Sequence, residues 1–136
     1  MTTFQLSLVS PERLLFSGQV DQVDLPGVEG DFGLLAGHAP IVAALRPGIV
    51  TAIAGNDRDG FVILGGVAEF SQSVLTILSD SATPADEFDL AEFKARIDEM
   101  QENLGKHSAG DELDRAITLL DHYKSIHTSL APATAF

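Results

Sequence analysis

The stretch IVTAIAGNDRDGFVIL, residues 49–64, decides the fold class of this chain. Two apolar runs, 49–54 and 61–64, flank a polar connection that is bounded by Gly55 and Gly60. A glycine-bounded polar connection between two such runs is typical of a β-hairpin. We therefore expect two antiparallel strands here, and the neighbouring segments become candidates for the strands beside them.

Short apolar or alternating segments lie on both sides of this predicted hairpin. They cover residues 4–9, 14–16, 19–25, 41–45, 67–70 and 74–78. Turn residues separate them, at 10–12, 17–18, 26–27, 46–48 and 65–66. Short strands at roughly even spacing predict an all-β sandwich, a flattened barrel of short strands, over residues 1–84.

The connection PGVEGDFGLLAGHAP, residues 26–40, contains four glycines and two prolines. Its glycine spacing does not fit a dinucleotide fingerprint, and no Lys-Ser or Lys-Thr pair follows it as a phosphate-binding loop requires. Glu29 and Asp31 are either solvated carboxylates of an ordinary loop or an acidic contact for a basic partner. Both alternatives stay open at this point.

After Pro84 the apolar period changes from two to about three and a half. Leu90, Phe93, Ile97, Met100 and Leu104 form one stripe, and Asp89 with Glu92 is a candidate capping pair. A second stripe contains Leu113, Ala116, Ile117, Leu120, Tyr123 and Ile126 or His127. We predict an antiparallel helical hairpin over 85–130, with 131–136 as a tail. The residues that we expect to pack the hairpin are Leu90, Phe93, Ile97, Met100, Leu113, Ile117 and Leu120. The alternative is that the first stripe leaves this contact and packs against another partner.

Composition limits the classes of partner. The chain has 136 residues, a formal net charge of −12 and a pI near 4.4, so it repels nucleic acid and anionic lipid. It has no cysteine, and we expect neither a signal peptide nor a membrane-spanning helix. Direct lipid insertion is therefore not expected.

Catalytic and metal-binding patterns are weak. His122 and His127 are five residues apart, which is not the i, i+4 spacing that brings two imidazoles to one metal. None of the turn serines, Ser10, Ser17 and Ser71, lies in a nucleophile elbow. We expect no catalytic residue, no metal and no cofactor.

Several segments together resemble the epsilon subunits of F-type ATP synthases. They are VSPE at 9–12, LFSG at 15–18, PGVEGDFGLL at 26–35, GHAP at 37–40, LRPG at 45–48 and GGVAEF at 65–70. The resemblance implies a non-catalytic central-stalk (rotor) subunit that links the gamma subunit to the c-ring and couples proton translocation to ATP synthesis. It also implies a c-ring contact at Glu29, Gly30 and Asp31, and a gamma contact at His38, Ala39, Pro40, Ile41 and Val42.

The same resemblance implies a regulatory role for the two helices, which in this family can extend and dock basic residues on the alpha and beta catalytic subunits. Here the second helix has four acids and only two bases, so we expect weak inhibition. Some members bind ATP through a motif with two arginines, and Glu92 and Glu99 stand at those positions here. We therefore expect no ATP site.

Two rival functions remain. One is a stand-alone, ATP-sensing inhibitor of ATP hydrolysis, and the other is a β-sandwich adaptor with an unrelated partner. The expected location is peripheral, on the cytoplasmic face of the bacterial inner membrane.

Overall fold

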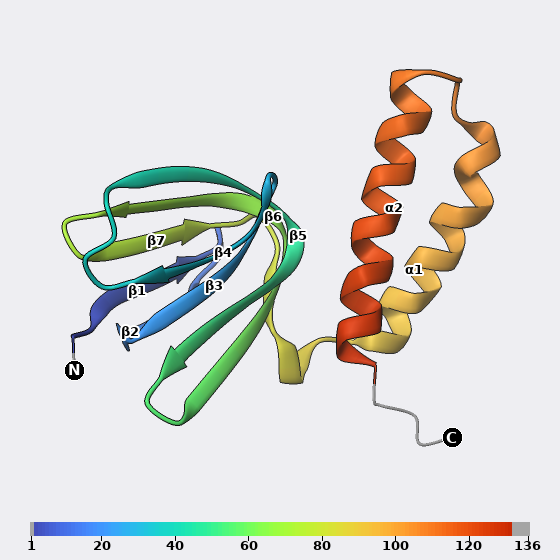
Figure 1. The fold of residues 1–136 in the computed structure, drawn as a ribbon. Helices are drawn as coiled ribbons and strands as arrows, with labels where there is room; N and C mark the ends of the chain where they lie inside the picture. Colours follow the sequence, from blue (N-terminus) through green and yellow to red (C-terminus); the bar gives the residue numbers. More distant parts are fainter. Residues whose placement is uncertain (1, 132–136) are drawn as a thin grey trace. The chain divides into compact units, whose positions relative to one another are not determined.

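The computed structural model of the chain describes residues 2–131, so the predicted tail lies outside the described residues apart from Ala131. Two units are present, one ending at Phe88 and the other beginning at Asp89. The first is a β unit and the second consists of helices (Figure 1). The predicted fold class, an all-β unit followed by a helical hairpin, is confirmed.

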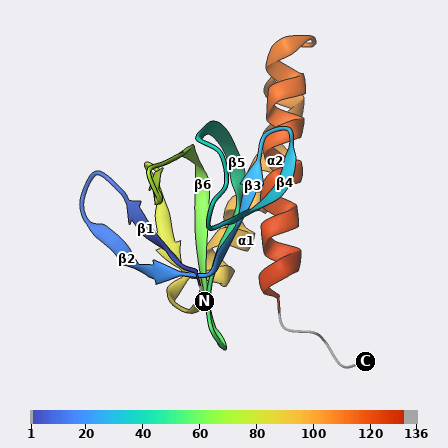
Figure 2. The same ribbon diagram turned by 60° about the vertical axis from the view of Figure 1, so that its left-hand side comes forward.

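Within residues 2–131, eight strands form one continuous hydrogen-bonded sheet in the order β2-β1-β7-β6-β5-β3-β4, with β8 paired to β6. Their bounds are β1 (Phe4–Val9), β2 (Leu14–Val20), β3 (Gln22–Gly27), β4 (Gly30–Leu35), β5 (Ile41–Ala54), β6 (Asp57–Ser71), β7 (Val74–Leu78) and β8 (Ala82–Pro84). The short helix η1 (Ala85–Glu87) follows β8. Figure 2 shows the β1–β2 and β3–β4 hairpins on either side of β5 and β6.

Strands β1 to β7 each place buried side chains in a single apolar core. In β1, Phe4, Leu6 and Leu8 are at most 1% exposed, while the residues between them are half-buried. β2 to β7 contribute to the same cluster, which includes Val23, Val50 and Ile77. Burial on one face of β1 to β7 is what holds the sandwich together, because apolar area removed from water is the main stabilising contribution.

The two longest strands pass from one layer of the sandwich to the other. In β5 both Leu45 and Val50 are buried, although they are five residues apart. Because side chains alternate between the two faces of a strand, an odd separation places these residues on opposite faces, so β5 turns a different face to the core between them. The first half of β6 pairs with β8 and the second half with β7. The turns predicted at 46–48 and 65–66 are therefore wrong, since these residues bend two continuous strands.

Gly66 explains why a double glycine stands at the bend of β6. A Cβ atom at Gly66 would lie 2.4 Å from the carbonyl oxygen of Leu78 on the neighbouring strand, which no side chain tolerates. The sequence predicts a turn between two strands at this glycine pair. The pair marks a close approach between strands and not the end of one.

Three further details differ from the predicted strands. The connection at 26–40 is mostly a β-hairpin, β3–β4, whose turn is formed by Val28 and Glu29. The break between β2 and β3 falls at Asp21 and not at Ser17-Gly18. The short β8 was not predicted, because three residues that end in proline carry no periodic pattern.

The second unit contains α1 (Leu90–Glu102), the short η2 (Asn103–Lys106) and α2 (Asp111–Leu130). Asp89 caps α1, where its side chain accepts a hydrogen bond from the Glu92 amide at 3.0 Å. The rings of Phe93 and Tyr123 lie 5.0 Å apart, and the Arg96 guanidinium lies 5.2 Å from the Tyr123 ring. These contacts pair α1 with α2.

Candidate functional site

The turn of the β3–β4 hairpin is anchored to β5. The Val28 amide donates a 3.0 Å hydrogen bond to the carbonyl oxygen of Ala44. Val28 is 59% exposed, and Glu29, Gly30 and Asp31 are also exposed. The three residues predicted to contact the c-ring therefore form one protruding but anchored turn, which we call the hairpin tip (residues 28–31).

Arg46 of β5 joins both strands of this hairpin. Its Nη1 donates to the carbonyl oxygen of Gly27 at 2.5 Å, and its Nη2 forms an ion pair with Oδ1 of Asp31. The Arg46 side chain is 26% exposed, whereas that of Asp31 is 76% exposed. Asp31 therefore already has an internal cationic partner. Within residues 2–131, Glu29 has none.

The residues predicted to contact gamma lead into β5 and then lie along it. His38, Ala39 and Pro40 are exposed, and the His38 ring stands edge-on to Phe70 with 6.2 Å between centroids. Ile41 is half-buried and packs against the core, while Val42 is 69% exposed. Four of the five residues are thus accessible, and Ile41 faces inward.

A row of apolar residues crosses the outer face of four strands next to these residues. Strand register places Ala44 opposite Val67, Val67 opposite Leu78, and Leu78 opposite Val9. Val67 is 44% exposed and Leu78 is 53% exposed. We call these four residues the apolar row. Val42 lies two residues before Ala44 and therefore on the same face of β5.

A hollow adjoins the apolar row where β6 bends. It is lined by Val9, Pro11, Gly66, Val67, Leu78 and Ser79, among others. The Ser79 hydroxyl, which is buried, donates to the carbonyl oxygen of Gly65 at 2.6 Å. This hydrogen bond links the residue after β7 to the bend in β6.

The apolar row and the hairpin tip share a border. Ala44 belongs to the row, and its carbonyl oxygen accepts the hydrogen bond that anchors Val28. The segments that carry the two predicted contacts are thus neighbours in space as well as in sequence. Sequence reasoning missed Arg46, Val67 and Leu78. The alternation in 67–70 and 74–78 could have placed Val67 and Leu78 on the outer face.

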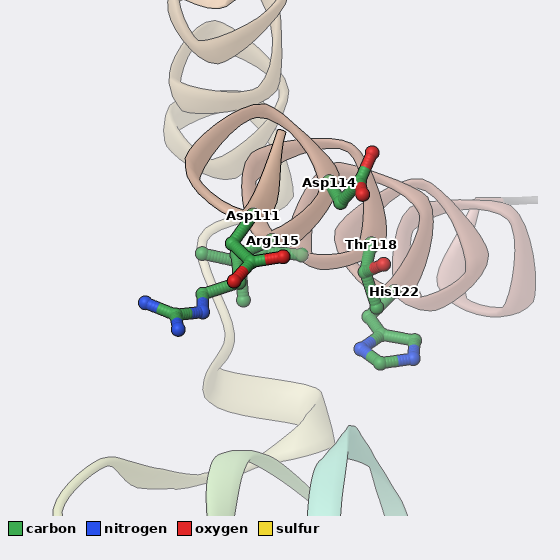
Figure 3. A pocket seen from close by; sticks show the side chains of 6 residues that line it. Asp111, Asp114, Arg115, Thr118 and His122 are labelled. Atoms are coloured by element: carbon green, nitrogen blue, oxygen red, sulfur yellow. The ribbon is translucent and has the colours of Figure 1, made fainter. Parts of the chain in front are cut away.

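A second hollow lies along α2 (Figure 3). Its lining residues all belong to this one helix: Asp111, Asp114, Arg115, Thr118, Leu119 and His122. The predicted packing residues divide between two environments, since Leu120 is 2% exposed but Ile117 is 40% exposed. Phe93 and Ile97 are buried, and Leu90, Met100 and Leu113 are half-buried. Tyr123 and Ile126 are the further buried residues of α2.

The positions of the missing ATP-motif arginines lie on the solvent side of α1. Glu92 and Glu99 are both exposed, and the Asp89 carboxylate is engaged as the helix cap. This part of α1 presents carboxylates, which repel phosphate groups. In the described part of the chain, no group of three or more His, Asp or Glu side chains could hold a metal ion.

None of the helices within residues 2–131 has the length and apolar character needed to span a bilayer. The first unit contains eleven acidic and three basic residues. A surface of this kind favours basic partners.

Comparison with known proteins gives matches over the whole chain. The family model for the beta-sandwich domain of the ATP synthase delta/epsilon chain matches residues 3–85. The ATP synthase epsilon chain 2 of Nitrobacter hamburgensis is 74% identical over 136 residues, which is 100% of both chains. The ATP synthase epsilon chain of Rhodopseudomonas palustris strain BisB18 is 60% identical over 131 residues, or 96% of each chain.

Solved structures share the fold at low identity. A chain of the mitochondrial ATP synthase of Euglena gracilis, solved with OSCP, F1 and the c-ring, superimposes with a TM-score of 0.80 and 24% identity. The match covers 96% of this chain and 83% of that one. A chain of the Tetrahymena thermophila central stalk and c-ring gives a TM-score of 0.68 and 14% identity, with 92% and 93% covered. These likenesses concern the fold.

Proposed function

The chain belongs to the family of ATP synthase epsilon chains, and from this membership we propose that it is a non-catalytic rotor subunit. In this role it links the gamma subunit to the c-ring of an F-type ATP synthase and couples proton translocation to ATP synthesis. The observation that carries the proposal is the pair of adjoining surfaces on the sandwich, the apolar row and the hairpin tip.

The apolar row, with Val42, is the proposed contact for gamma. Val42, Val67 and Leu78 expose large apolar side chains on one face of the sheet, and such groups are a mark of protein interfaces. His38, Ala39 and Pro40 extend the same contact along the connection into β5. A contact spread over four hydrogen-bonded strands resists shear, because no single flexible side chain carries the load.

The hairpin tip is the proposed contact for the c-ring. Glu29, Gly30 and Asp31 protrude from the sandwich, and the acidic character of the tip matches a basic group on the ring. Since the tip borders the row at Ala44, one rigid body would hold both partners in a fixed relation. This fixed relation is what the transmission of torque requires.

In this proposal the two helices inhibit ATP hydrolysis only weakly. α2 carries Asp111, Glu112, Asp114 and Asp121 against Arg115 and Lys124. An excess of carboxylates opposes docking on acidic sites of the alpha and beta subunits. The exposed Glu92 and Glu99 of α1 argue in the same way against ATP sensing, and therefore against a stand-alone, ATP-sensing inhibitor.

As part of such a complex the chain would lie peripherally, on the cytoplasmic face of the bacterial inner membrane. The relatives at 74% and 60% identity come from bacteria, which favours this location.

A substitution in the proposed gamma contact tests the function. Val42→Asp introduces a charge at a position that is 69% exposed, so the sandwich should still fold. We expect weaker association with gamma and reduced proton-driven ATP synthesis in reconstituted membranes. Leu35→Asp is the matched control, since Leu35 is 56% exposed and lies outside the row. Full synthesis by the Val42→Asp variant would contradict the proposal.

A further inference from the structure

The two carboxylates of the hairpin tip are in different electrostatic situations. Asp31 is paired with Arg46, whereas Glu29 has no ion-pair partner within residues 2–131. Both side chains are exposed, so exposure alone does not distinguish them. The tip therefore presents one uncompensated negative charge, at Glu29.

Arg46 also controls the backbone of the tip. Its guanidinium reaches the end of β3 through the Gly27 carbonyl oxygen and the start of β4 through Asp31. Gly27 and Gly30 are opposed in the β3–β4 register, so the guanidinium closes the hairpin at the base of its turn. A planar guanidinium can make two such contacts at once, which a lysine ammonium on a flexible chain does less well.

From these contacts we infer that Glu29 alone forms the electrostatic contact with a basic group of the ring, while Arg46 and Asp31 act as positioning residues that hold the turn. The inference rests on the proposed function, because it assigns roles within the proposed c-ring contact. A cation that approached Asp31 would have to compete with Arg46. A cation at Glu29 meets no such competitor.

The first experiment needs no partner. Amide hydrogen exchange of the full chain reports opening of the turn, and the Val28 amide is protected by its bond to Ala44. Arg46→Gln and Asp31→Asn should each accelerate exchange at Val28 by ~10-fold or more, while Glu29→Gln leaves it unchanged. Arg46→Lys keeps the charge but should also accelerate exchange. Unchanged exchange in Arg46→Gln and Arg46→Lys would overturn the positioning role.

The second experiment measures binding of the full chain to a detergent-purified assembly of gamma and c-ring over a series of salt concentrations. Glu29→Gln should remove most of the salt dependence contributed by the tip. The double variant Asp31→Asn with Arg46→Gln keeps the net charge of the tip, so it should retain the salt dependence and bind more weakly at every salt concentration. Asp59→Asn, at an exposed position near the start of β6, is the control for net charge.

The results separate the inference from the function on which it rests. If the unsubstituted chain does not bind the assembly, the proposed function fails, and the assignment to Glu29 fails with it. If the unsubstituted chain binds but Glu29→Gln keeps the full salt dependence, only the assignment to Glu29 is overturned. Loss of salt dependence in the double variant alone would make Asp31 the contact instead.

Discussion

At the scale of single residues, the turn between β6 and β7 stores strain. Gln72 has φ 52° and Ser73 has φ 63°, and neither is glycine. Because Ser71 and Val74 pair directly, these two residues form a two-residue hairpin turn of the type that favours Asn-Gly. Replacing them with Gln72→Asn and Ser73→Gly should raise the free energy of unfolding by about 1 kcal/mol, measured by urea denaturation.

Ser73→Ala alone is the control for this change, since alanine keeps the unfavourable positive φ. It should not stabilise the chain. A double variant no more stable than the natural sequence would show that the turn relieves its strain in another way.

Two glycines separate the effect of space from the effect of backbone conformation. Gly66→Ala should lower the free energy of unfolding by about 2–3 kcal/mol, because the new Cβ meets the Leu78 carbonyl oxygen. Gly55→Ala should lose only about 1 kcal/mol, since Gly55 has φ 62° but no atom within 4 Å of its Cβ position. Equal losses in urea denaturation would contradict the close approach at Gly66.

Arg46 shows what sequence reasoning cannot reach at this scale. Glu29 and Asp31 were identified as candidates because carboxylates in a glycine-rich turn are visible in the sequence. The difference between them, that Asp31 has an ion-pair partner, is not visible in the sequence. Its partner Arg46 is 15 residues away and meets Asp31 only after β3, β4 and β5 have paired. A contact between segments distant in sequence leaves no local pattern.

At the scale of elements, the helical hairpin depends on a specific aromatic pair. Phe93 is 5% exposed and Tyr123 is 4% exposed, with 5.0 Å between their rings. A double-mutant cycle of Phe93→Ala and Tyr123→Ala should give a coupling of about 0.5–1.5 kcal/mol, measured from the loss of helical ellipticity in denaturant. Phe93→Ala with Asp114→Ala, an exposed residue, should show no coupling. Additive losses for the aromatic pair would contradict the contact.

The carboxylates of α1 predict how the chain responds to nucleotide. Glu92 and Glu99 replace the arginines of the ATP motif, and Asp89 is occupied as the cap. Calorimetric titration with ATP should therefore show no binding at micromolar concentrations. The matched experiment uses Glu92→Arg with Glu99→Arg, which should increase the heat of binding if charge is the obstacle. Micromolar affinity of the natural sequence would contradict this reasoning.

The sequence predicted which segments form strands, but it did not predict how long the two longest strands are. The alternation in β1 and β7 gave both strands their observed bounds, because one face of each is buried. β5 and β6 were each divided in two, since proline and glycine at their bends look like the end of a strand. Local turn chemistry cannot distinguish a bend within a strand from a turn between two strands.

At the scale of the whole molecule, fold class and family were both accessible from the sequence. The period change near Pro84 placed the helices, and the conspicuous glycine and proline segments carried the resemblance. The apolar row was not predicted as a surface, because its four residues come from four strands and are brought together only by register. Such a surface needs the sheet order, which one sequence does not provide.

We propose that the sandwich joins gamma through the apolar row and the c-ring through the hairpin tip. The chain contains no cysteine, so a single substitution gives a unique attachment point for a photoactivatable cross-linker. Val42→Cys should cross-link to gamma and Glu29→Cys to the ring in the assembled ATP synthase, while Asp59→Cys should cross-link to neither. If Val42→Cys and Glu29→Cys give no products with these two partners, the account of this chain as their connector is wrong.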